Sequence, residues 1–338
     1  MPLIKIDNTG EQFQQTDTDD CILRAGLASG LGLSYECNSG GCGSCKFDLL
    51  EGEVETLWAE APGLSARDIK KNRRLACQSR ALTDLRIRMH TAPEFQLPVP
   101  AERQRLILLE RRAITGDIVE FRFQATREAV FLPGQYALLH LPGVGAPRAY
   151  SMSNLPNQNG EWAFWVRRVA GGAGTTVLFE KLRRGDHITL DGPYGMAHLR
   201  PDSPRDLVCI AGGSGISPML SIARSAASDP AMVGRRLDFF FGGRRPEDLC
   251  GQPELAELSG GPGAQVTYHC AVSDPDVGPD WSGERGFIHE LVQRQIKGQL
   301  VNRECYLAGP PPMVQATQRA LVLEEGVSQE QVHFDRFF

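Results

Sequence analysis

The sequence predicts three domains in chain order: a cysteine-containing segment of mixed strands and helices, an antiparallel barrel, and a doubly wound parallel sheet. Three observations support this prediction. Four of the nine cysteines lie at defined spacings within residues 37–77, short strand-like runs fill residues 105–200, and strand-like and helix-like runs alternate from about residue 206. A chain of 338 residues is also long for a single hydrophobic core, so two or three domains are expected.

The composition is that of an ordinary globular protein, with 41% hydrophobic and 23% charged residues and a net charge of −5. The chain has no long basic run, which argues against general nucleic-acid binding. No window approaches the roughly 18 apolar residues of a membrane helix, and the first residues lack the pattern of a signal peptide. We therefore expect a cytoplasmic, monomeric protein that binds neither nucleic acid nor membranes, with no disulfide framework.

The cysteines of the first domain have the spacing of a cluster-binding loop. "YECNSGGCGSCKF" contains three of them in the order C-x4-C-x2-C, and the fourth lies in "RLACQSR" after 31 intervening residues. This spacing is typical of plant-type [2Fe-2S] domains, and the predicted metal ligands are Cys37, Cys42, Cys45 and Cys77. The glycines between these cysteines would let the backbone approach a cluster closely.

Two other interpretations of the cysteine loop remain open from the sequence. A structural zinc site usually has two C-x2-C knuckles, and only Cys42 and Cys45 could form one here. A loop of free thiols is the second alternative. The iron–sulfur interpretation is favoured because all four positions fit it.

Charge is distributed unevenly within the first domain. Residues 1–60 hold 11 acidic and 3 basic side chains, whereas residues 61–98 hold 3 acidic and 8 basic ones. The run "SARDIKKNRR" supplies most of the positive charge. Such a run is usually a solvated helix face, and the alternative is a docking surface for a redox partner.

The middle of the chain predicts an antiparallel barrel. A linker with three prolines, "TAPEFQLPVPAERQ", precedes it. Short strand-like runs bounded by glycine, proline and asparagine follow, and one helix-like piece, "TTVLFEKL", interrupts them. The predicted strands are "RLILLERR", "DIVEFRFQ", "QYALLHL", "EWAFWVRRV" and "HITLDGP".

The last part of the chain predicts a parallel sheet with helices on both faces, because strand-like and helix-like runs alternate. The strand-like runs are "DLVCIA", "LDFFFGG", "QVTYHCAVS" and "ECYLAG". The helix-like runs are "SPMLSIARSAAS", "GFIHELVQRQI" and "PPMVQATQRALVLEEG". We place the domain boundaries at 1–92 for the cysteine domain, 93–104 for the linker, 105–203 for the barrel and 204–338 for the sheet domain.

Two motifs in the barrel could bind an anion together. "PRAYSMSN" contains an R-x-Y-S pattern, which is weak by itself and is otherwise typical of an exposed loop with a surface arginine. The glycine-rich turn in "VRRVAGGAGTTVL" enters a predicted helix with Thr175 and Thr176 at its start. A helix N-terminus with free N–H groups and hydroxyls is an anion site, so the arginine and this terminus could bracket a pyrophosphate.

A glycine-rich turn also begins the sheet domain. "CIAGGSGISPML" places Gly212, Gly213 and Gly215 after a strand and before a helix, in which Pro218 is expected at the first position. The pattern is not G-x-G-x-x-G, so the usual dinucleotide fingerprint is not met. A plain tight turn is the alternative.

Together these motifs resemble the ferredoxin–NADP reductase superfamily, with an N-terminal plant-type ferredoxin domain of β-grasp fold. Within it, the chain resembles the reductase components of bacterial multicomponent oxygenases, above all those of diiron toluene and alkene monooxygenases. The similar segments are "YECNSGGCG", "APGLSARDIKKNRRLACQ", "RAYS", "AGGSGISPM" and "HFDRFF". The resemblance implies FAD, a [2Fe-2S] cluster and NADH, with NADPH less favoured, as cofactors.

The resemblance also implies roles for individual residues near the flavin. Arg148 would pair with the FAD pyrophosphate, Tyr150 would pack on the isoalloxazine, and the Ser151 hydroxyl would lie near flavin N5. The terminal Phe338 would cover the flavin face, so Tyr150, Ser151 and Phe338 are the predicted catalytic residues. Further flavin-binding positions implied by the resemblance are Val166 and Arg167 along the flavin edge and Gly172 and Thr175 in the glycine-rich turn.

For the dinucleotide, the resemblance implies the following residues: Gly212, Gly213, Gly215, Pro218, Arg244, Gly309, Pro310 and Met313. "LAGPPPMV" departs from the family pattern, because Ala308 stands where a cysteine is usual, which puts any thiol role in hydride transfer in doubt. Arg244 or Arg245 could meet a 2′-phosphate, but no further basic cluster accompanies them, so we expect NADH.

The function implied is an oxidoreductase that passes electrons from NADH to FAD, to the cluster, and then to a Rieske-type ferredoxin or a diiron hydroxylase. The alternative is the reductase of a Rieske ring-hydroxylating dioxygenase, and a third is the reductase partner of a deoxysugar-forming dehydratase. From another class, a binding module with a structural four-cysteine zinc and no turnover remains open.

Overall fold

The computed structural model describes residues 1–338, which form two compact units. The first unit contains residues 1–101 together with Phe338, and the second contains residues 102–337. The second unit holds both an antiparallel barrel and a parallel sheet. The predicted fold class, with three architectures in this chain order, is therefore confirmed.

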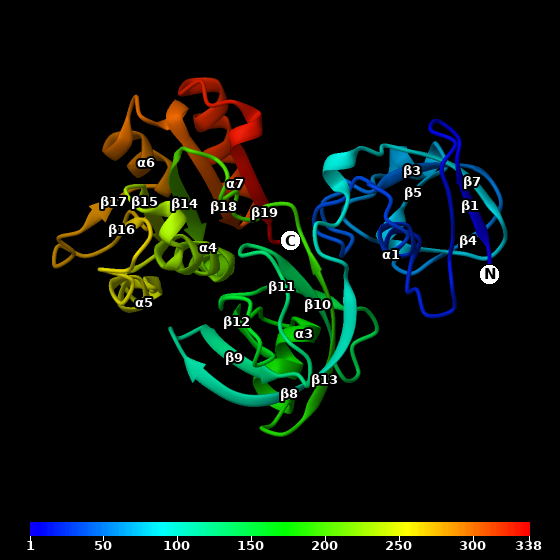
Figure 1. Cartoon of the computed structure of the whole chain (residues 1–338), viewed down its shortest axis with the longest axis horizontal. Helices are drawn as coiled ribbons and strands as arrows, with labels where there is room; N and C mark the ends of the chain where they lie inside the picture. The colour runs from blue at the N-terminus through cyan, green and yellow to red at the C-terminus, as the bar shows by residue number, and fades with distance from the viewer. The chain divides into compact units, whose positions relative to one another are not determined.

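The first unit is built on a five-stranded mixed sheet in the order β2-β1-β7-β3-β5, with β4 and β6 as a separate pair (Figure 1). Only β1 and β7 pair in parallel, and Ile4 and Ile6 of β1 and Ile87 of β7 are fully buried. The strands are β1 Leu3–Ile6, β2 Gln12–Gln14, β3 Lys46–Glu51, β4 Val54–Thr56, β5 Arg73–Leu75, β6 Ser79–Ala81 and β7 Leu85–Met89. The helices are α1 Ile22–Ala28 and α2 Ala66–Lys70, with short turns η1 Ala76–Gln78 and η2 Pro93–Phe95.

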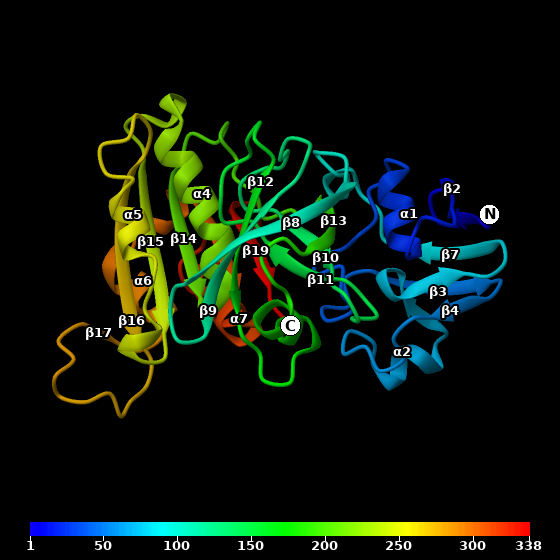
Figure 2. The same ribbon diagram turned by 90° about the horizontal axis from the view of Figure 1, so that it is seen from below.

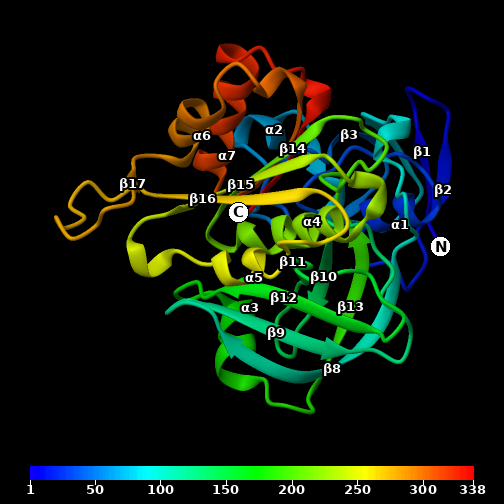
Figure 3. The same cartoon turned by 60° about the vertical axis from the view of Figure 1, so that its left-hand side comes forward.

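The barrel of the second unit has the strand order β11-β10-β13-β8-β9-β12, and every pair is antiparallel (Figure 3). A bridge between Met152 and Phe164 joins the segment after β11 to β12 and closes the barrel. The strands are β8 Glu102–Ala113, β9 Ile118–Gln124, β10 Tyr136–His140, β11 Arg148–Ser151, β12 Glu161–Arg167 and β13 His187–Tyr194. α3 Ala173–Thr176 continues into a π turn, η3 Val177–Lys181.

The parallel sheet has the order β17-β16-β15-β14-β18-β19. The strands are β14 Asp206–Gly212, β15 Arg236–Gly243, β16 Gln265–Val272, β17 Glu284–Arg285, β18 Arg303–Gly309 and β19 Val332–Arg336. The chain builds outward from β14 through β15, β16 and β17, then returns to place β18 on the other side of β14. This reversal makes the carboxyl ends of β14 and β18 a topological switch point, where such sheets bind ligands.

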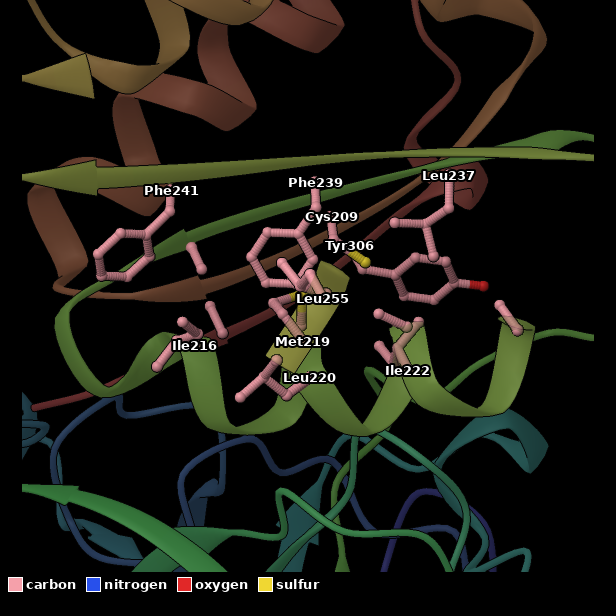
Figure 4. Close-up of a cluster of buried hydrophobic side chains, with 14 of the residues drawn as sticks. Cys209, Ile216, Met219, Leu220, Ile222, Leu237, Phe239, Phe241, Leu255 and Tyr306 are labelled. Atoms are coloured by element: carbon pink, nitrogen blue, oxygen red, sulfur yellow. The ribbon is translucent and has the colours of Figure 1, made fainter. Parts of the chain in front are cut away.

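Helices cover both faces of the parallel sheet, as the alternating pattern predicts (Figure 2). One face packs against α4 Ile216–Ser228 and α5 Gln252–Ala256, and the other against α6 Ile288–Ile296 and α7 Pro311–Arg319. Figure 4 shows Phe239 and Phe241 of β15 pointing toward Met219 and Ile216 of α4. The remaining short turns are η4 Gly213–Gly215, η5 Pro230–Met232, η6 Pro246–Asp248, η7 Leu300–Asn302, η8 Ala320–Glu324 and η9 Gln329–Gln331.

One local prediction was wrong. Pro218 is not the first helical residue, because α4 begins at Ile216 and Pro218 is its third; the first turn still tolerates it, since its N–H would lack an intrahelical partner. The R-x-Y-S motif lies in strand β11, which was not among the predicted strands. In the first unit, β3 and β4 are separate strands, because the chain turns between them at Gly52, whose φ is +94°.

None of the helices combines the length and the apolar character that crossing a membrane requires.

Candidate functional sites

The four predicted cluster ligands converge in the first unit. Cys37, Cys42 and Cys45 lie in the loop between α1 and β3, and Cys77 lies in η1. The Sγ atoms of Cys45 and Cys77 are 3.3 Å apart, which is too long for a disulfide, and all four cysteines are free thiols. The loop and η1 therefore gather four sulfur ligands without a covalent cross-link between them.

Backbone N–H groups of the cysteine loop point at these sulfur atoms. The N–H of Cys42 donates to Cys37 Sγ at 3.4 Å, and the N–H of Ser44 donates to Cys42 Sγ at 3.4 Å. Hydrogen bonds of this kind orient sulfur ligands and tune the reduction potential of an iron–sulfur cluster. Four soft sulfur ligands with N–H donors around them fit a [2Fe-2S] cluster.

Protonation of the paired thiols also differs within the loop. A hydrogen bond from the Cys42 thiol lowers the pKa of Cys37 to about 5, and the same contact raises the pKa of Cys42. The contact with Cys45, together with burial, raises the pKa of Cys77. The sulfur atoms are thus close enough that a thiolate on one cysteine disfavours deprotonation of its neighbour. Positively charged irons would offset this repulsion between thiolates.

The cysteine loop rests on a second loop, residues 57–64. The N–H of Gly63 donates to the Gly40 carbonyl at 2.9 Å. Gly43 has φ of +81°, and a Cβ there would lie 2.7 Å from the Gly63 carbonyl oxygen. Trp58 packs against Gly40, where an added Cβ would lie 3.1 Å from the ring, and the tryptophan remains 45% exposed. Glycine is therefore required for this close backbone approach.

The second candidate site lies on β11 and α3 of the barrel. A Cβ at Gly174 would lie 2.9 Å from Tyr150 Oη and 3.1 Å from Arg148 Cγ, so α3 approaches both side chains closely. Arg148 Nη1 donates to the carbonyls of Ala146 and Pro147 at 2.9 and 3.3 Å, and no carboxylate neutralises its charge. The R-x-Y-S motif and the glycine-rich turn therefore lie together in the structure, as the sequence analysis expects. An arginine without an acidic partner beside the start of a helix fits a pyrophosphate.

Burial raises the pKa of Tyr150 to about 12, although the nearby charge of Arg148 partly offsets this effect. The phenol is therefore protonated at neutral pH and can donate a hydrogen bond. Ser151, the next residue of β11, is 5% exposed. The three residues of the motif thus offer a cation, a neutral phenol and a hydroxyl in one strand.

Other predicted flavin residues have different surroundings. The Thr175 hydroxyl donates to the carbonyls of Val169 and Gly172 at 3.1 and 3.2 Å, so it shapes the glycine-rich turn. Val166 is 2% exposed and belongs to the barrel core, which leaves its backbone as the part that could face a ligand. Phe338 is 59% exposed.

The third candidate site is a cavity of about 440 Å³ at the switch point of the parallel sheet. Its walls come from the carboxyl ends of β14, β15, β16 and β18 and from the loop before α6. Five of the eight predicted dinucleotide residues line it: Gly212, Gly213, Arg244, Pro310 and Met313. A cavity of this size at this edge of a doubly wound sheet fits a nucleotide.

Two of the remaining dinucleotide residues, Gly215 and Gly309, allow the loops beneath the cavity to cross. A Cβ at Gly215 would overlap the carbonyl of Ala308, and a Cβ at Gly309 would lie 2.8 Å from the Gly212 carbonyl oxygen. Gly212 itself faces Met313, whose Sδ would be 2.5 Å from an added Cβ. Pro218, the last of the eight, lies inside α4 and does not line the cavity.

Some cavity residues were missed by sequence reasoning. Arg167, expected along the flavin edge, lines this cavity near Gly213, and its Nε donates to Asp117 Oδ2 at 2.5 Å. Phe287 and His289 also line it, with rings stacked 5.8 Å apart. Arg167 is the last residue of β12, whereas Phe287 and His289 lie at the start of α6, so residues far apart in the chain meet here.

The two arginines after β15 differ in their partners. Arg245 Nε donates to Asp274 Oδ2 at 2.9 Å, whereas the guanidinium of Arg244 has no carboxylate partner. Asp248 lies on the cavity wall and accepts hydrogen bonds from the backbone N–H groups of both arginines, at 3.1 and 3.0 Å. The cavity therefore presents one carboxylate and one available guanidinium at the end of β15.

These features define a class: an oxidoreductase with a cysteine-ligated cluster domain, a flavin-type barrel and a dinucleotide-type sheet. Three domain families match the chain accordingly. They are the 2Fe-2S iron-sulfur cluster binding domain over residues 4–82, the oxidoreductase FAD-binding domain over residues 105–199, and the oxidoreductase NAD-binding domain over residues 209–319. The cofactors that the sequence predicts are thereby supported by three separate domains.

Full-length relatives agree with this class. The ferredoxin–NAD(P)+ reductase CarAd of Metapseudomonas resinovorans is 41% identical over 94% of both chains. The ferredoxin–NAD+ reductase component of the alkene monooxygenase system of Xanthobacter autotrophicus is 39% identical over 98% of this chain and 99% of its own. The solved structure of the ferredoxin reductase in carbazole 1,9a-dioxygenase has a TM-score of 0.88 and 38% identity, covering 100% of this chain and 98% of that one.

The chain belongs to the family of ferredoxin–NAD(P)+ reductase components of multicomponent oxygenases.

Proposed function

We propose that this chain takes hydride from NADH at a bound FAD and delivers single electrons, through a [2Fe-2S] cluster, to a monooxygenase component or to its ferredoxin. The observation that supports this most directly is the convergence of four cysteine sulfurs in a chain that also has FAD-binding and NAD-binding domains. Flavin supplies the needed chemistry when bound, because it accepts two electrons as hydride and can release them one at a time.

The cluster ligands in this proposal are Cys37, Cys42, Cys45 and Cys77. Cys37, Cys45 and Cys77 are buried, which limits water access, and the loop N–H groups stabilise negative charge on sulfur. The exposed ring of Trp58 touches this loop, so it offers a short path between the cluster and an acceptor protein. The exposed basic side chains of α2, Arg67 and Lys70, would attract an acidic surface of that acceptor.

The flavin would be bound by β11 and α3. Arg148 would neutralise the pyrophosphate with its unpaired guanidinium, Tyr150 would lie against the ring system, and the Ser151 hydroxyl would reach N5. Further residues with proposed contacts to flavin are Gly172 and Thr175, through the shape of their turn, Val166 and Arg167 along the strand, and Phe338, which would cover the ring until nicotinamide arrives.

The dinucleotide would occupy the cavity at the switch point, on Gly212, Gly213, Pro310 and Met313, with Gly215, Gly309 and Pro218 shaping the loops below. NADH is favoured over NADPH. Arg245 is held by Asp274, and the carboxylate of Asp248 on the cavity wall would oppose the attraction of Arg244 for a 2′-phosphate. A higher kcat/KM with NADH than with NADPH is expected in ferricyanide reduction.

The oxygenase served is proposed to be a monooxygenase. Relatives named as parts of alkene, xylene/toluene and phenol monooxygenases are 39%, 35% and 33% identical over at least 97% of this chain. A second candidate, a Rieske ring-hydroxylating dioxygenase, is favoured by one specific observation, the 38% identical structure of a reductase from a carbazole dioxygenase. NADH-driven turnover with a purified diiron hydroxylase and not with a Rieske dioxygenase would support the first, and the reverse would support the second.

A cluster-ligand variant tests the electron path. In Cys77→Ala the cluster should fail to assemble, because one of four sulfur ligands is lost. Reduction of cytochrome c by NADH should then fall to background, whereas reduction of ferricyanide, which takes electrons at the flavin, should persist. Cys305→Ala, which removes a buried cysteine in β18, is the matched control and should keep both activities.

Two outcomes would contradict the proposed path. Full cytochrome c reduction in Cys77→Ala would mean that electrons leave without the cluster. A colourless wild-type protein with stoichiometric zinc and no flavin would indicate a binding module and not an oxidoreductase.

A further inference from the structure

Helix α4 has two different faces. Its apolar face packs on the parallel sheet (Figure 4), and its opposite face turns toward the barrel. Three polar side chains on that second face, at i, i+4 and i+7, donate to carbonyls of the last residue of β11 or of the residues just after it. Ser217 Oγ donates to the Ser151 carbonyl at 2.7 Å, Ser221 Oγ to Asn154 at 2.7 Å, and Arg224 Nη1 to Ser153 at 2.6 Å.

The Ser217 hydroxyl contacts both strands at one position of the ladder that closes the barrel. The bridge between Met152 and Phe164 sets the antiparallel register, so Ser151 and Trp165 face each other. One step further along, the N–H of Ser153 donates directly to the Ala163 carbonyl at 2.8 Å.

At the Ser151–Trp165 position a side chain of α4 also joins the two strands. The N–H of Trp165 donates to Ser217 Oγ at 3.1 Å, and the same oxygen donates its proton to the Ser151 carbonyl. A hydroxyl is both donor and acceptor, so it can bridge the two backbone groups. Ser217 is 1% exposed, so water does not compete for this position.

We propose that Ser217 is a positioning residue: its hydroxyl, which reaches from the dinucleotide domain to the barrel ladder, ties β11 to β12 and so fixes Ser151 for hydride transfer. This inference rests on the proposed function, because it takes the flavin to lie on β11. α4 also starts at the glycine turn of the dinucleotide cavity, next to Gly213 and Gly215. One rigid helix therefore links the two sites between which hydride moves.

Losing the hydroxyl would remove one hydrogen bond from the Trp165 N–H and one from the Ser151 carbonyl. Buried backbone groups that lose hydrogen bonds are costly, so the two strands would rearrange locally. Such a rearrangement would move the Ser151 backbone. A shift of about 1 Å at a hydride-transfer site can lower the rate by about a hundredfold.

The test compares Ser217→Ala with Ser221→Ala in the full-length, FAD-loaded protein. Both variants remove one hydroxyl of α4 that donates to a barrel carbonyl at 2.7 Å, but only Ser217 bridges the two strands. Stopped-flow reduction of the flavin by saturating NADH should slow by about tenfold or more in Ser217→Ala and by less than about twofold in Ser221→Ala. Ser217→Thr keeps the hydroxyl and should restore the rate, and the Kd for NADH should be unchanged in all three.

A second readout does not depend on hydride transfer. Amide hydrogen exchange is measured on the same proteins after FAD is removed. The Trp165 amide should exchange differently in Ser217→Ala, whereas the Ser153 amide, which has a direct partner, should not change. Ser221→Ala should leave both amides as in the wild type. If Ser217→Ala does not fold, Ser217→Cys replaces it, and its weaker hydrogen bonds should give an intermediate rate.

The outcomes separate the inference from the proposed function. If NADH does not reduce the wild-type flavin, the proposed function fails, and unchanged Trp165 exchange in Ser217→Ala would then overturn the bridging role as well. Only the inference is overturned if NADH reduces the flavin equally fast in the wild type and in Ser217→Ala. The same holds if flavin reduction is slowed to the same extent in Ser217→Ala and in Ser221→Ala.

Discussion

Arg148 is a partly buried cation whose hydrogen-bond partners are two carbonyls of its own chain segment, at Ala146 and Pro147. A cation without a carboxylate, next to the start of α3, is suited to a diphosphate. The proposed role of Arg148 depends on the positive charge of its guanidinium, so a single substitution tests it.

Arg148→Ala should weaken FAD binding by about tenfold to a hundredfold, which corresponds to the loss of charge-assisted hydrogen bonds. The measurement is the flavin content of the purified protein, followed by titration of the apoprotein with FAD. Arg105→Ala, an exposed arginine of β8, is the matched control and should retain full flavin content. Unchanged FAD affinity in Arg148→Ala would remove this residue from the site.

His198 illustrates a buried titratable group. It is 7% exposed, and burial, together with the charge of Arg200, lowers its pKa to about 4. The unfolded chain binds this proton near pH 6.5 and the native chain does not, so stability should fall as pH decreases from about 6.5 to about 4. The loss from this group is about 3 kcal/mol at most.

Urea unfolding of the wild type and of His198→Gln at pH 7.5, 6 and 5 measures this effect. The variant should lose less stability than the wild type over the same interval. Equal losses in the two proteins would show that His198 does not titrate as described.

At this scale the sequence predicted cluster residues better than cavity residues. Cys37, Cys42, Cys45 and Cys77 have a spacing that is itself the signal, because one loop supplies three ligands. Arg167 gives no such signal. It lines the dinucleotide cavity only because β12 lies against η4, a tertiary contact that no local pattern records.

Among the elements, α2 supports the cysteine loop from outside. Ser65 and Asp68 form a capping box at its start, and Asp68 also binds Lys46 at 2.9 Å and Arg73 at 3.3 Å. Lys46 follows Cys45 directly, so the carboxylate of Asp68 connects the start of α2 with the end of the cysteine loop. The hydrogen bond from the Ser65 hydroxyl lowers the pKa of Asp68 most, and the hydrogen bond from Lys46 lowers it further.

Asp68→Ala should destabilise the first unit by about 1 kcal/mol or more, since the cap is lost together with two ion pairs. Urea unfolding, followed through the visible absorption of the cluster, measures this, and Glu60→Ala, an exposed acidic residue, is the control. Asp68 contributes its full share to the stability of the first unit at pH values above the ordinary pKa of an aspartate. This contribution should be lost as pH falls through the lowered pKa of Asp68 in the folded protein. An unchanged midpoint would contradict the bracing role of α2.

Element types followed from the sequence where periodicity was strong, as in α4 and the strands of the parallel sheet. β11 was not predicted, because it is four residues long and three of its side chains, those of Arg148, Tyr150 and Ser151, are charged or polar. Its partner β10 and the bridge after it hold it in the barrel, which is a tertiary effect. The start of α4 was placed late because the glycine turn already coils into η4.

For the whole molecule, three architectures in one chain place three kinds of redox chemistry on separate scaffolds. The order of domains could be predicted, because each domain has its own pattern of cysteines, short strands or alternating elements. The class of oxygenase served was predicted only through the family resemblance, because no local pattern of this chain identifies it. Overall similarity does not separate the two classes, since relatives named for a monooxygenase system and for a dioxygenase are 39% and 38% identical to this chain.

The most direct test of the account is anaerobic addition of NADH to the purified holoprotein, followed by low-temperature electron paramagnetic resonance. The account predicts a rhombic signal from a reduced [2Fe-2S] cluster, which Cys77→Ala lacks. A cluster that dithionite reduces but NADH leaves oxidised, while the flavin is bleached, would contradict the claim that this chain passes electrons from nicotinamide to iron.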